Sequence, residues 1–522
     1  MQGPDFNGAA TRTTLPLALL DARDRHGGAT VILEDPERTP LSYDRVILGA
    51  LVLGRKLEAV AGRGRRVGVL LPSVNGVVVT LFGLLFHGMT PVMLNFTAGV
   101  RNLRSACQTA EIDTIVTSRR FVDQARLDEV VAALGEGRRI VYLEDVRKTI
   151  GLWDKVSGLL RSKLARRIAR QAGTDPDAPA VILFTSGTEG VPKGVVLSHA
   201  NLLSNVGQIW QHAAGMLTTA DIAFNPLPVF HSFGLTAGTL LGLMNGMKVV
   251  LYPSPLHYKQ VPKLVSETKA TLLFATDTFL VGYARAADEG ELASLRLVVT
   301  GAERVKDATR ALWSPFGTTI LEGYGCTECS PVLACNLPTE NRTGTVGKLL
   351  PGVTARLDPV DGIHDGAKLL VKGPNVMAGY MLADAPGVVK ALPDEWYDTG
   401  DIVHIDEDGF VAIRGRAKRF AKLGGEMVSL AAVEAMAASL WPDATHVAIA
   451  MPDVKKGEQI VLVSDKPDAD RSALIAHARE QGAAELYVPK AILVVETIPV
   501  LGSGKIDYVG TSELAYRMRT LI

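Results

Sequence analysis

Short apolar runs alternate with helical patterns along much of the chain. Between residues 66 and 146, RVGVLLP, TPVMLNF, DTIVTS and RIVYLEDV predict strands, and intervening segments such as GVVVTLFGLLFHG have the apolar spacing of helices. The alternation continues from KVVLYPS (248–254) to TTILEGYG. Strands that alternate with helices are typical of parallel sheets with helices on both faces. We therefore predict an α/β fold with a large N-terminal body of layered βαβ sheets.

The pattern changes from about Gly347, where short strands with turn residues replace the alternation. After RGRAKRF (414–420), a compact α+β stretch continues to residue 522. A boundary there leaves a C-terminal part of roughly 100 residues, which is a normal domain size. We predict an N-terminal domain over residues 1–414 and a small α+β C-terminal domain over residues 415–522.

The apolar stretches and the composition argue against a membrane-spanning or nucleic-acid-binding protein. The most apolar long stretch, Val67 to Phe96, is interrupted by polar residues and prolines, whereas a spanning helix needs about 20 apolar residues. The apolar run Leu15 to Leu20 is shorter than the core of a signal peptide. Lysine plus arginine equals aspartate plus glutamate, at 55 each, so no net field attracts nucleic acid. With 4 cysteines the chain fits a reducing compartment, and we predict a cytoplasmic protein.

Residues 153–171, WDKVSGLLRSKLARRIARQ, combine apolar positions at helical spacing with many lysines and arginines. A basic amphipathic helix of this kind can rest on an anionic lipid surface or dock an acidic protein. It can equally be a solvated helix that packs on its own domain. Peripheral contact with the inner face of a membrane through this segment is therefore one of the open interpretations.

A glycine-rich segment, LFTSGTEGVPKG (183–194), follows the strand-like AVILF and has the composition of a phosphate-binding loop. A Walker loop has a glycine directly before its lysine and a serine or threonine after it, but here Pro192 and Gly194 flank Lys193. Glycines let the backbone approach phosphate oxygens, hydroxyls add donors, and the lysine adds positive charge. The alternative is a flexible surface loop. The candidate phosphate-binding residues are Thr185, Ser186, Gly187, Thr188, Gly190 and Lys193.

The segment TSGTEGVPKG resembles the signature loop of the acyl-adenylate-forming superfamily of AMP-binding enzymes, which includes acyl-CoA synthetases, luciferases and the adenylation domains of peptide synthetases. Further motifs stand in the family's order: EGYGCTECSP (322–331), WYDTGD (396–401), RGRAKRFAKLGGEMVSL (414–430) and PVLGSGKIDY (499–508). An ordered set over almost the whole chain is more specific than any single motif. The resemblance implies ATP and Mg²⁺ as cofactors and a mobile C-terminal domain.

The resemblance also implies roles for the residues of EGYGCTECSP. Glu328 is the implied Mg²⁺ ligand, since a hard cation prefers carboxylate oxygens, and the Thr327 hydroxyl is expected to contact the α-phosphate. Tyr324, which Gly325 follows, is expected beside the adenine. A weaker match places Gly301, Ala302 and Glu303 at the adenine and acyl pockets.

Cys326 and Cys329 in the same motif allow a different interpretation, as half of a zinc or redox site. A zinc site needs a second pair of ligands, and Cys335 alone does not provide one. The sequence therefore favours the carboxylate as the metal-binding group of this motif.

The resemblance implies that residues of three later motifs complete the nucleotide-binding and catalytic site. Asp401 is expected to accept hydrogen bonds from the ribose hydroxyls, although an aspartate in a turn is more often a backbone cap. Arg416 is implied to reach the ribose or the phosphates, and Lys418 to be the hinge of the mobile domain. Lys505 is implied to drive adenylation, because a cation between the acyl carboxylate and the α-phosphate offsets the charge that develops during transfer. Without the resemblance, Arg416, Lys418 and Lys505 would be interpreted as solvated surface charges.

The stretch PVFHSFGL (228–235) stands where the family has an aromatic gate to its acyl tunnel. The resemblance implies this gating role for Phe230 and His231, whereas a lone histidine is more often structural. The apolar segment that follows, GLTAGTLLGLMNGM (234–247), is either a lining of the tunnel or an ordinary core helix.

Within the superfamily, the sequence is most similar to the synthetase half of the bacterial bifunctional acyl-ACP synthetase/2-acylglycerophosphoethanolamine acyltransferase group. This similarity implies ATP-dependent activation of a fatty acid. An acyl-adenylate forms, and the acyl group then passes to the phosphopantetheine thiol of acyl carrier protein or CoA. Acyltransferase activity is not expected, because the sequence leaves no room for that domain.

Other functions stay open on the sequence alone. The enzyme could activate a different carboxylic acid, or stop at the acyl-adenylate. It could also be a non-catalytic nucleotide-binding relative, or a membrane-docked scaffold that uses residues 153–171. The presence of Lys193, Glu328, Asp401 and Lys505 favours a catalytic protein.

Overall fold

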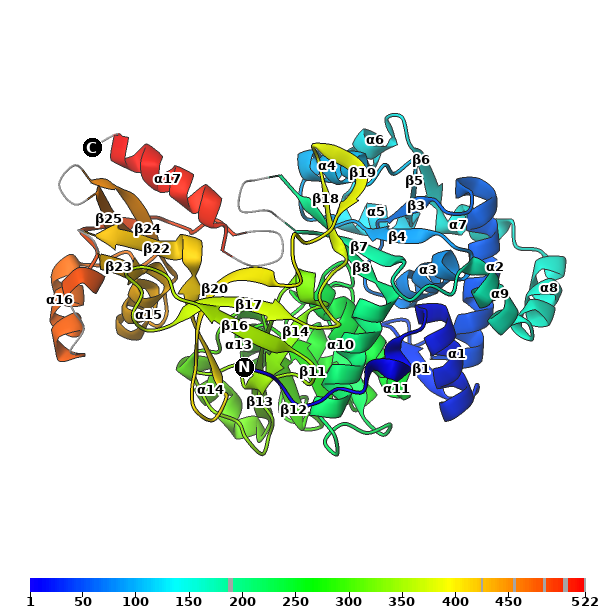
Figure 1. Ribbon diagram of the computed structural model, residues 1–522, viewed down its shortest axis with the longest axis horizontal. Coiled ribbons are helices and arrows are strands. Elements are labelled where there is room, and N and C mark those ends of the chain that lie inside the picture. Colours follow the sequence, from blue (N-terminus) through cyan, green and yellow to red (C-terminus); the bar gives the residue numbers. More distant parts are fainter. Residues whose placement is uncertain (186–190, 424–425, 454–456, 482–484, 501–505, 521–522) are drawn as a thin grey trace. The chain divides into compact units, whose positions relative to one another are not determined.

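The structure is a computed structural model that describes residues 1–185, 191–423, 426–453, 457–481, 485–500 and 506–520. The chain forms two compact units. The larger unit contains residues 2–354 and 372–395, and the smaller contains Met1 with residues 355–371 and 396–522. Figure 1 colours the chain from blue to red, so the orange and red elements all belong to the smaller unit.

The first sheet of the larger unit has the strand order β19-β18-β8-β7-β4-β3-β5-β6 in the described residues. Strands β4, β3, β5 and β6 pair in parallel, while β8, β18 and β19 extend the sheet with antiparallel pairs. The apolar stretch that was predicted as strand, helix and strand is confirmed as β3, α3 and β4. The strands are β3 (Arg66–Val69), β4 (Thr90–Met93), β5 (Thr114–Thr117), β6 (Arg139–Tyr142), β7 (Pro179–Thr185), β8 (Lys193–Ser198), β18 (Gly379–Leu382) and β19 (Ala385–Lys390).

The second sheet of the larger unit has the order β15-β14-β13-β12-β11-β9-β10-β1-β2. Its centre is parallel from β1 to β13, and β2, β14 and β15 add antiparallel edges. The strands are β1 (Val31–Glu34), β2 (Leu41–Ser42), β9 (Ile222–Asn225), β10 (Lys248–Leu251), β11 (Leu272–Ala275), β12 (Leu297–Thr300), β13 (Thr319–Gly325), β14 (Val332–Cys335) and β15 (Lys348–Leu349).

Helices surround both sheets of the larger unit (Figure 1). Residues Phe233–Leu240 form a π-helix that continues into α11, and this segment is almost entirely buried. The α-helices are α1 (Leu15–His26), α2 (Tyr43–Ala61), α3 (Asn75–Phe86), α4 (Val100–Thr109), α5 (Arg119–Ala125), α6 (Asp128–Gly135), α7 (Leu143–Lys148), α8 (Leu152–Ser162), α9 (Ala165–Ala172), α10 (His199–His212), α11 (Leu241–Asn245), α12 (Gln260–Thr268), α13 (Asp277–Ala286) and α14 (Asp307–Trp313).

The smaller unit contains a sheet of order β16-β17-β20-β21 and a second sheet of order β23-β22-β25-β24, in which β26 pairs with β25. The strands are β16 (Thr354–Asp358), β17 (Ala367–Lys372), β20 (Tyr397–Ile405), β21 (Val411–Arg416), β22 (Phe420–Leu423), β23 (Glu426–Ser429), β24 (His446–Asp453), β25 (Gly457–Ser464) and β26 (Ala491–Val494). The helices are α15 (Leu430–Leu440), α16 (Arg471–Glu480) and α17 (Tyr508–Thr520).

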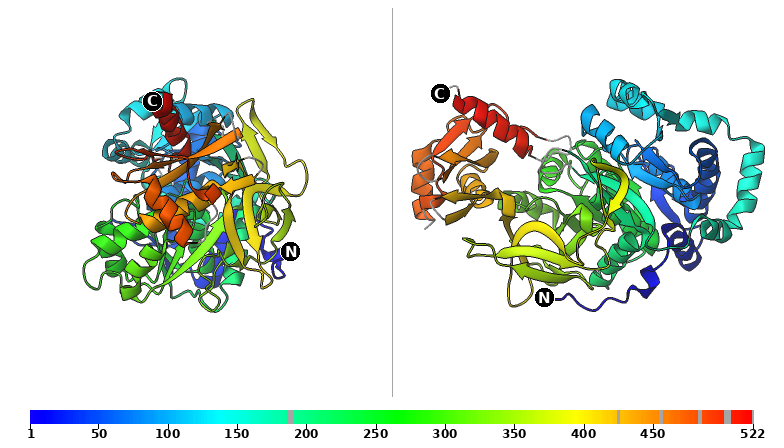
Figure 2. Two further views of the ribbon diagram at one scale, coloured as in Figure 1. Left: turned by 90° about the vertical axis from the view of Figure 1, so that its left-hand side faces the viewer. Right: turned by 45° about the horizontal axis from the view of Figure 1, so that its top comes forward.

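Successive side chains of a strand point to opposite faces of the sheet. In the sheet of β22 to β26 both sets are apolar, so both faces of this sheet are packed. Val447 and Val461 pack with Ala515 of α17, whereas Ala448 and Leu462 pack in a second cluster with α15 and α16. Figure 2 shows α17 (red) on one side of these strands and α16 (orange) on the other. This arrangement confirms the predicted α+β character of the C-terminal part.

The predicted fold class, layered βαβ sheets followed by a smaller α+β part, is confirmed. The smaller compact unit extends beyond the predicted C-terminal domain, since it also holds residues 355–371 and 396–414. The predicted domain boundary between residues 414 and 415 marks where a mobile C-terminal domain would begin. Because one structure shows one conformation, this boundary stays a prediction.

Within the described parts of the chain, none of the helices combines the length and the apolar character that crossing a bilayer requires.

Candidate functional site

The glycine-rich loop joins two antiparallel strands. Thr185 ends β7 and Lys193 begins β8, and the two residues are paired across the hairpin. Four predicted phosphate-binding residues between them lie outside the described residues: Ser186, Gly187, Thr188 and Gly190. Because β8 separates the loop from α10, the loop does not open directly into a helix as a Walker loop does.

Three other motifs lie at one edge of the second sheet. Strands β9, β11, β12 and β13 are parallel neighbours, so their carboxyl ends share an edge. The segment 226–232, which contains the proposed gate, follows β9; Gly301 directly follows β12; and Thr327 and Glu328 lie just past the end of β13. In open α/β sheets this edge is where ligands bind.

Glu328 is held by the first sheet. The Tyr380 hydroxyl on β18 donates to Glu328 Oε1 at 2.8 Å, and the Met377 N–H donates to the Glu328 carbonyl at 2.7 Å. Lys193 Nζ lies 5.7 Å from the centroid of the Tyr380 ring. Tyr380 therefore connects the lysine of the loop to the predicted metal-binding carboxylate.

The neighbouring Thr327 contacts the segment of the proposed gate. Ser232 Oγ lies 3.3 Å from Thr327 Oγ1. Just before it, the ring of Phe230 lies 4.7 Å from that of His231 and 5.0 Å from that of Phe96, measured between centroids. Lys193, Tyr380, Glu328, Thr327 and Ser232 thus form one contact chain, called the Glu328 cluster below.

Gly301, Ala302 and Glu303 lie beside the same edge but differ in their surroundings. Gly301 packs closely on Phe233, since an added Cβ would lie 3.2 Å from its ring. Ala302 has φ +68°, a conformation that is uncommon outside glycine and is often found at functional sites. Glu303 accepts hydrogen bonds from the Thr278 N–H at 3.1 Å and hydroxyl at 2.9 Å, so its carboxylate is engaged at the start of α13.

Tyr324 and Gly325 end β13. Tyr324 is buried, with 8% of the residue exposed, and Gly325 is exposed. A Cβ at Gly325 would collide with the carbonyl of Pro331, so this close approach of the two segments requires glycine.

The smaller unit carries Asp401, Arg416 and Lys418. Asp401 on β20 is opposite Arg416 on β21, and Arg416 Nε lies 2.8 Å from Asp401 Oδ1. The carboxylate is buried while the guanidinium is exposed. Lys418 is exposed in a short 3₁₀ turn, Ala417–Arg419, between β21 and β22. Lys505 lies outside the described residues.

The zinc interpretation has no support in the described residues, where no group of three or more His, Cys, Asp or Glu side chains could hold a metal. Cys326 and Cys329 are free thiols, and Cys329 is buried. Glu328 is only half buried and lies next to the Thr327 hydroxyl. Such a carboxylate fits Mg²⁺, which takes one or two carboxylates together with phosphate oxygens.

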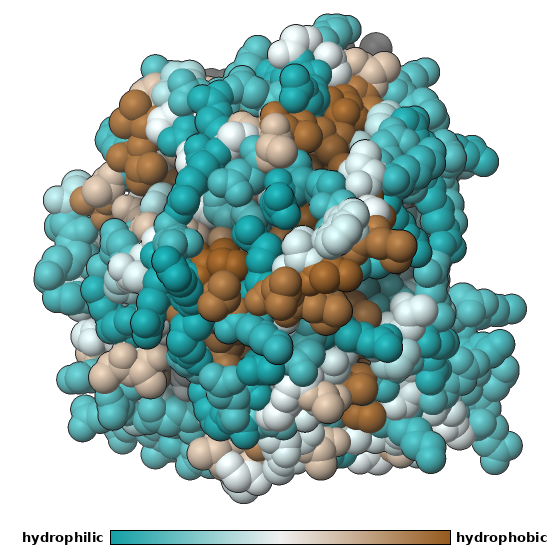
Figure 3. All heavy atoms as spheres, turned by 90° about the vertical axis from the view of Figure 1, so that its right-hand side faces the viewer, coloured by the Kyte–Doolittle hydropathy of each residue, from teal (hydrophilic) through white to brown (hydrophobic). Residues whose placement is uncertain are grey.

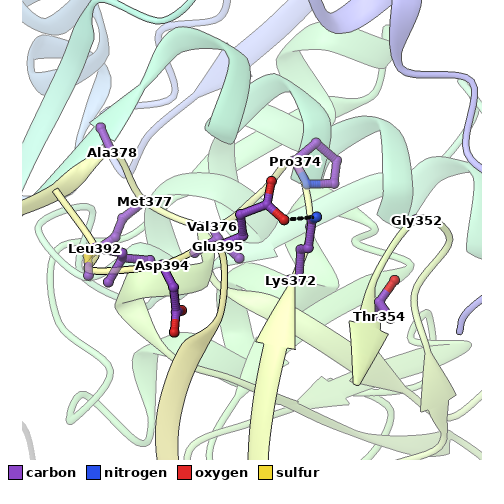
Figure 4. A pocket seen from close by; sticks show the side chains of 11 residues that line it. Gly352, Thr354, Lys372, Pro374, Val376, Met377, Ala378, Leu392, Asp394 and Glu395 are labelled. Atoms are coloured by element: carbon purple, nitrogen blue, oxygen red, sulfur yellow. Dashed lines mark hydrogen bonds and ion pairs between the residues drawn. The ribbon is translucent and has the colours of Figure 1, made fainter. Parts of the chain in front are cut away.

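The larger unit also contains a cavity of about 540 Å³ that the sequence did not indicate. Lys372 and Glu395 line this cavity and form an ion pair, as Figure 4 shows. Met377 and Ala378 line the cavity, and Met377 also binds the Glu328 carbonyl. The predicted site residues are not among its lining residues.

Sequence reasoning missed Tyr380 and Ser232. Tyr380 stands in GPNVMAGY, 52 residues from Glu328, and no spacing rule connects the two. Ser232 directly follows His231, which was singled out, but its contact with Thr327 spans 95 residues.

Comparisons with known proteins match the part of the chain that contains the Glu328 cluster. The model of the family described as AMP-binding enzyme matches residues 20–381. The long-chain-fatty-acid–CoA ligase of Yersinia pestis is 29% identical over 478 residues, covering 85% of this chain and 84% of that protein. The ligase of the same name from Bacillus subtilis (strain 168) is 27% identical over 529 residues, covering 94% and 93%.

The fold is also that of a solved structure. The crystal structure of ATP-bound MatB from Rhodopseudomonas palustris matches with a TM-score of 0.78 at 24% identity, covering 96% of this chain and 99% of that chain. The residues matched by the family model include the hairpin of β7 and β8 and the whole Glu328 cluster.

Proposed function

This chain belongs to the family of AMP-binding enzymes, and from that premise we propose that it uses ATP to activate a fatty acid and passes the acyl group to a phosphopantetheine thiol. The observation that carries the proposal is the Glu328 cluster. It joins a lysine, a carboxylate and three hydroxyl groups, and Ser232, Thr327 and Glu328 of the cluster lie at the carboxyl edge of a parallel sheet. These are the groups that binding a nucleotide triphosphate requires.

In the first half-reaction, a carboxylate oxygen of the acid attacks the α-phosphorus of ATP and pyrophosphate leaves. Both reactants are anions, so the barrier falls when donors and cations offset the charge that develops. Lys193 and the Thr327 hydroxyl are the groups of the cluster that we assign to the phosphates. Glu328 would hold Mg²⁺, which supplies positive charge to the phosphates when bound, and Tyr380 orients the Glu328 carboxylate.

In the second half-reaction, the thiol sulfur attacks the acyl carbon. A C–S bond forms, the C–O bond to AMP breaks, and the thiol proton is released. We propose that the C-terminal domain, residues 415–522, turns about Lys418 between the two steps. The position of Lys418 in an exposed turn between two sheets supports a hinge. Asp401 is assigned to the ribose, Arg416 to the ribose or the phosphates, and Lys505 to the adenylation step.

For the acid, we propose a long-chain fatty acid. The names of the Yersinia pestis and Bacillus subtilis relatives favour it. The buried apolar π-helix after the Phe230–His231 pair supports an apolar path for an alkyl chain, since each buried CH₂ contributes about 0.8 kcal/mol. The same relatives favour CoA as the acceptor, with acyl carrier protein as the alternative.

The test is ATP–pyrophosphate exchange with fatty acids of graded length, followed by thioester formation with CoA and with acyl carrier protein. We expect exchange that rises with chain length and a thioester with CoA. Exchange without any thioester would indicate an enzyme that stops at the acyl-adenylate, and exchange with aromatic acids alone would indicate another acid. Absence of exchange with every acid would refute the proposal and favour a non-catalytic relative.

Peripheral contact with a membrane through residues 153–171 is a separate proposal, because it requires nothing of the ATP site.

A further inference from the structure

Helix α8 carries its apolar side chains on the face that points away from the protein. Leu152, Trp153 and Leu160 are 79%, 86% and 62% exposed. Val156, Leu159 and Leu164 are exposed as well. A surface helix of a globular protein normally has the opposite arrangement, with its apolar stripe turned to the core.

The face of α8 that packs on the protein carries small and polar residues. Gly158 is buried on α2, where an added Cβ would lie 2.5 Å from Val52 Cγ2. Asp154 Oδ2 lies 2.9 Å from Lys56 Nζ of α2 and accepts the Gly151 N–H at 3.0 Å. Since a helix turns about 100° per residue, Asp154 and Gly158 lie on one side and Leu152, Val156 and Leu160 on the other. These contacts fix the orientation of the helix.

Cations surround the apolar face of α8. Lys155 and Lys163 are exposed beside it, and Arg167 and Arg170 are exposed on the adjoining α9. In the described residues these four have no carboxylate partner within ion-pair distance. Arg166, by contrast, binds Asp21 and Asp24 of α1. Figure 3 shows the side of the protein on which α8 lies, with brown apolar patches among teal polar side chains.

We propose that α8 docks this protein on an anionic lipid surface, with its apolar face in the interface and the cations of α8 and α9 among the headgroups. Tryptophan is enriched at membrane interfaces, and lysine and arginine can keep their charge in water while their stems lie along apolar surface. The proposal requires no ATP chemistry, so it stands or fails independently of the proposed function.

Charge argues for lipid over a second copy of this chain. In a two-fold interface the same patch meets itself, so the unpaired cations would face their own copies. Between residues 150 and 172, Asp154 is the acidic residue, and Lys56 already neutralises it. A surface dense in negative charge complements this patch, and the cytoplasmic leaflets of membranes provide one.

The experiment is flotation of the full chain with vesicles. We expect binding to phosphatidylglycerol/phosphatidylcholine vesicles, weakening with salt, and little binding to pure phosphatidylcholine. The variant Trp153→Gln/Leu160→Gln should lose binding. The variant Lys163→Gln/Arg167→Gln should bind anionic vesicles about 25-fold more weakly, since each cation near such a surface contributes about fivefold. All the substituted side chains are exposed, so thermal unfolding should be unchanged.

A matched control is Leu256→Gln/Val388→Gln, which removes two similarly exposed apolar side chains outside α8. It should bind vesicles as the wild type does. A blue shift of tryptophan emission on adding anionic vesicles, absent in Trp153→Phe, would place that side chain in the interface.

The proposal is overturned if the wild type does not float with anionic vesicles, or if the Trp153→Gln/Leu160→Gln variant floats as well as the control. Dimerisation that this variant abolishes, without vesicle binding, would assign the face to a second copy. Binding of a soluble acidic protein in place of vesicles would assign it to a protein partner. Either result refutes the lipid surface.

Discussion

At the scale of single residues, Tyr380 is the group on which the Glu328 cluster depends. Its hydroxyl donates to Glu328 and its ring lies near Lys193, so it holds together two motifs from different sheets. A hydrogen bond to a charged group contributes about 1.5–3 kcal/mol. Removing it leaves the carboxylate less well oriented for Mg²⁺.

We therefore predict that Tyr380→Phe lowers ATP–pyrophosphate exchange by about 10- to 100-fold and raises the Mg²⁺ concentration that gives half-maximal exchange. The ring and its contact with Lys193 are kept. The control is Tyr283→Phe, which removes a hydroxyl that donates to the Pro255 carbonyl at 2.8 Å and should affect stability alone. An unchanged Mg²⁺ dependence in Tyr380→Phe would exclude the orienting role.

A second residue-scale prediction concerns pH. Burial lowers the pKa of His199 to about 4, and the neutral ring accepts the Leu15 N–H at 3.1 Å. Because the folded pKa lies below the value of about 6.5 in an unfolded chain, the unfolded state binds the additional proton between these values. Stability is therefore complete above about pH 6.5 and is lost as the pH falls toward 4, by about 3 kcal/mol from this one group.

Urea unfolding at several pH values, comparing the wild type with His199→Gln, isolates this contribution. We expect the difference in unfolding free energy between the two proteins to be largest at neutral pH and to shrink toward pH 4. A difference that does not change with pH would show that His199 does not titrate as stated.

At the scale of elements, the π-helix Phe233–Leu240 depends on its close packing against β9. The Asn225 side chain donates to the Gly234 carbonyl at 2.9 Å and to Thr239 Oγ1 at 3.1 Å. A Cβ at Gly238 would collide with the Asn225 amide. π-helical segments are rare and occur often at functional sites.

We predict that Gly238→Ala destabilises the protein by about 1–3 kcal/mol, because the added methyl displaces Asn225. If this helix lines the acyl path, the variant also shifts the preferred acid length in pyrophosphate exchange. The control is Gly76→Ala in α3, where an added Cβ meets nothing within 4 Å. A stable Gly238→Ala protein would contradict the packing argument.

The elements also show what sequence can and cannot predict. Strand, helix and strand from β3 to β4 were predictable because their apolar residues are consecutive and bounded by turn residues. The strand that leads into EGYGCTECSP was predictable from the apolar run TTILEGYG, whereas the shared edge of the second sheet was not. The contacts of Tyr380 and Ser232 were not, since they join residues far apart in the chain. For α8, helical spacing predicted two faces but not which face the protein covers.

At the scale of the whole molecule, the proposed reaction needs two arrangements of the C-terminal domain in one cycle. We predict that Lys418→Pro keeps ATP–pyrophosphate exchange within about 3-fold of the wild type but slows thioester formation from supplied acyl-adenylate by at least about 10-fold. Proline fixes the backbone at the turn where rotation is proposed. Lys418→Ala, which removes the charge but keeps the backbone free, is the control. Equal losses in both half-reactions would exclude a hinge at Lys418.

The location of α8 has a consequence for how such a cycle could run on a bilayer. The helix belongs to the same compact unit as Lys193, Glu328 and Tyr380. A protein seated through α8 would therefore keep these groups at a constant height above the headgroups. A fatty acid that leaves the membrane would then meet the nucleotide-binding groups at one fixed distance from the headgroups.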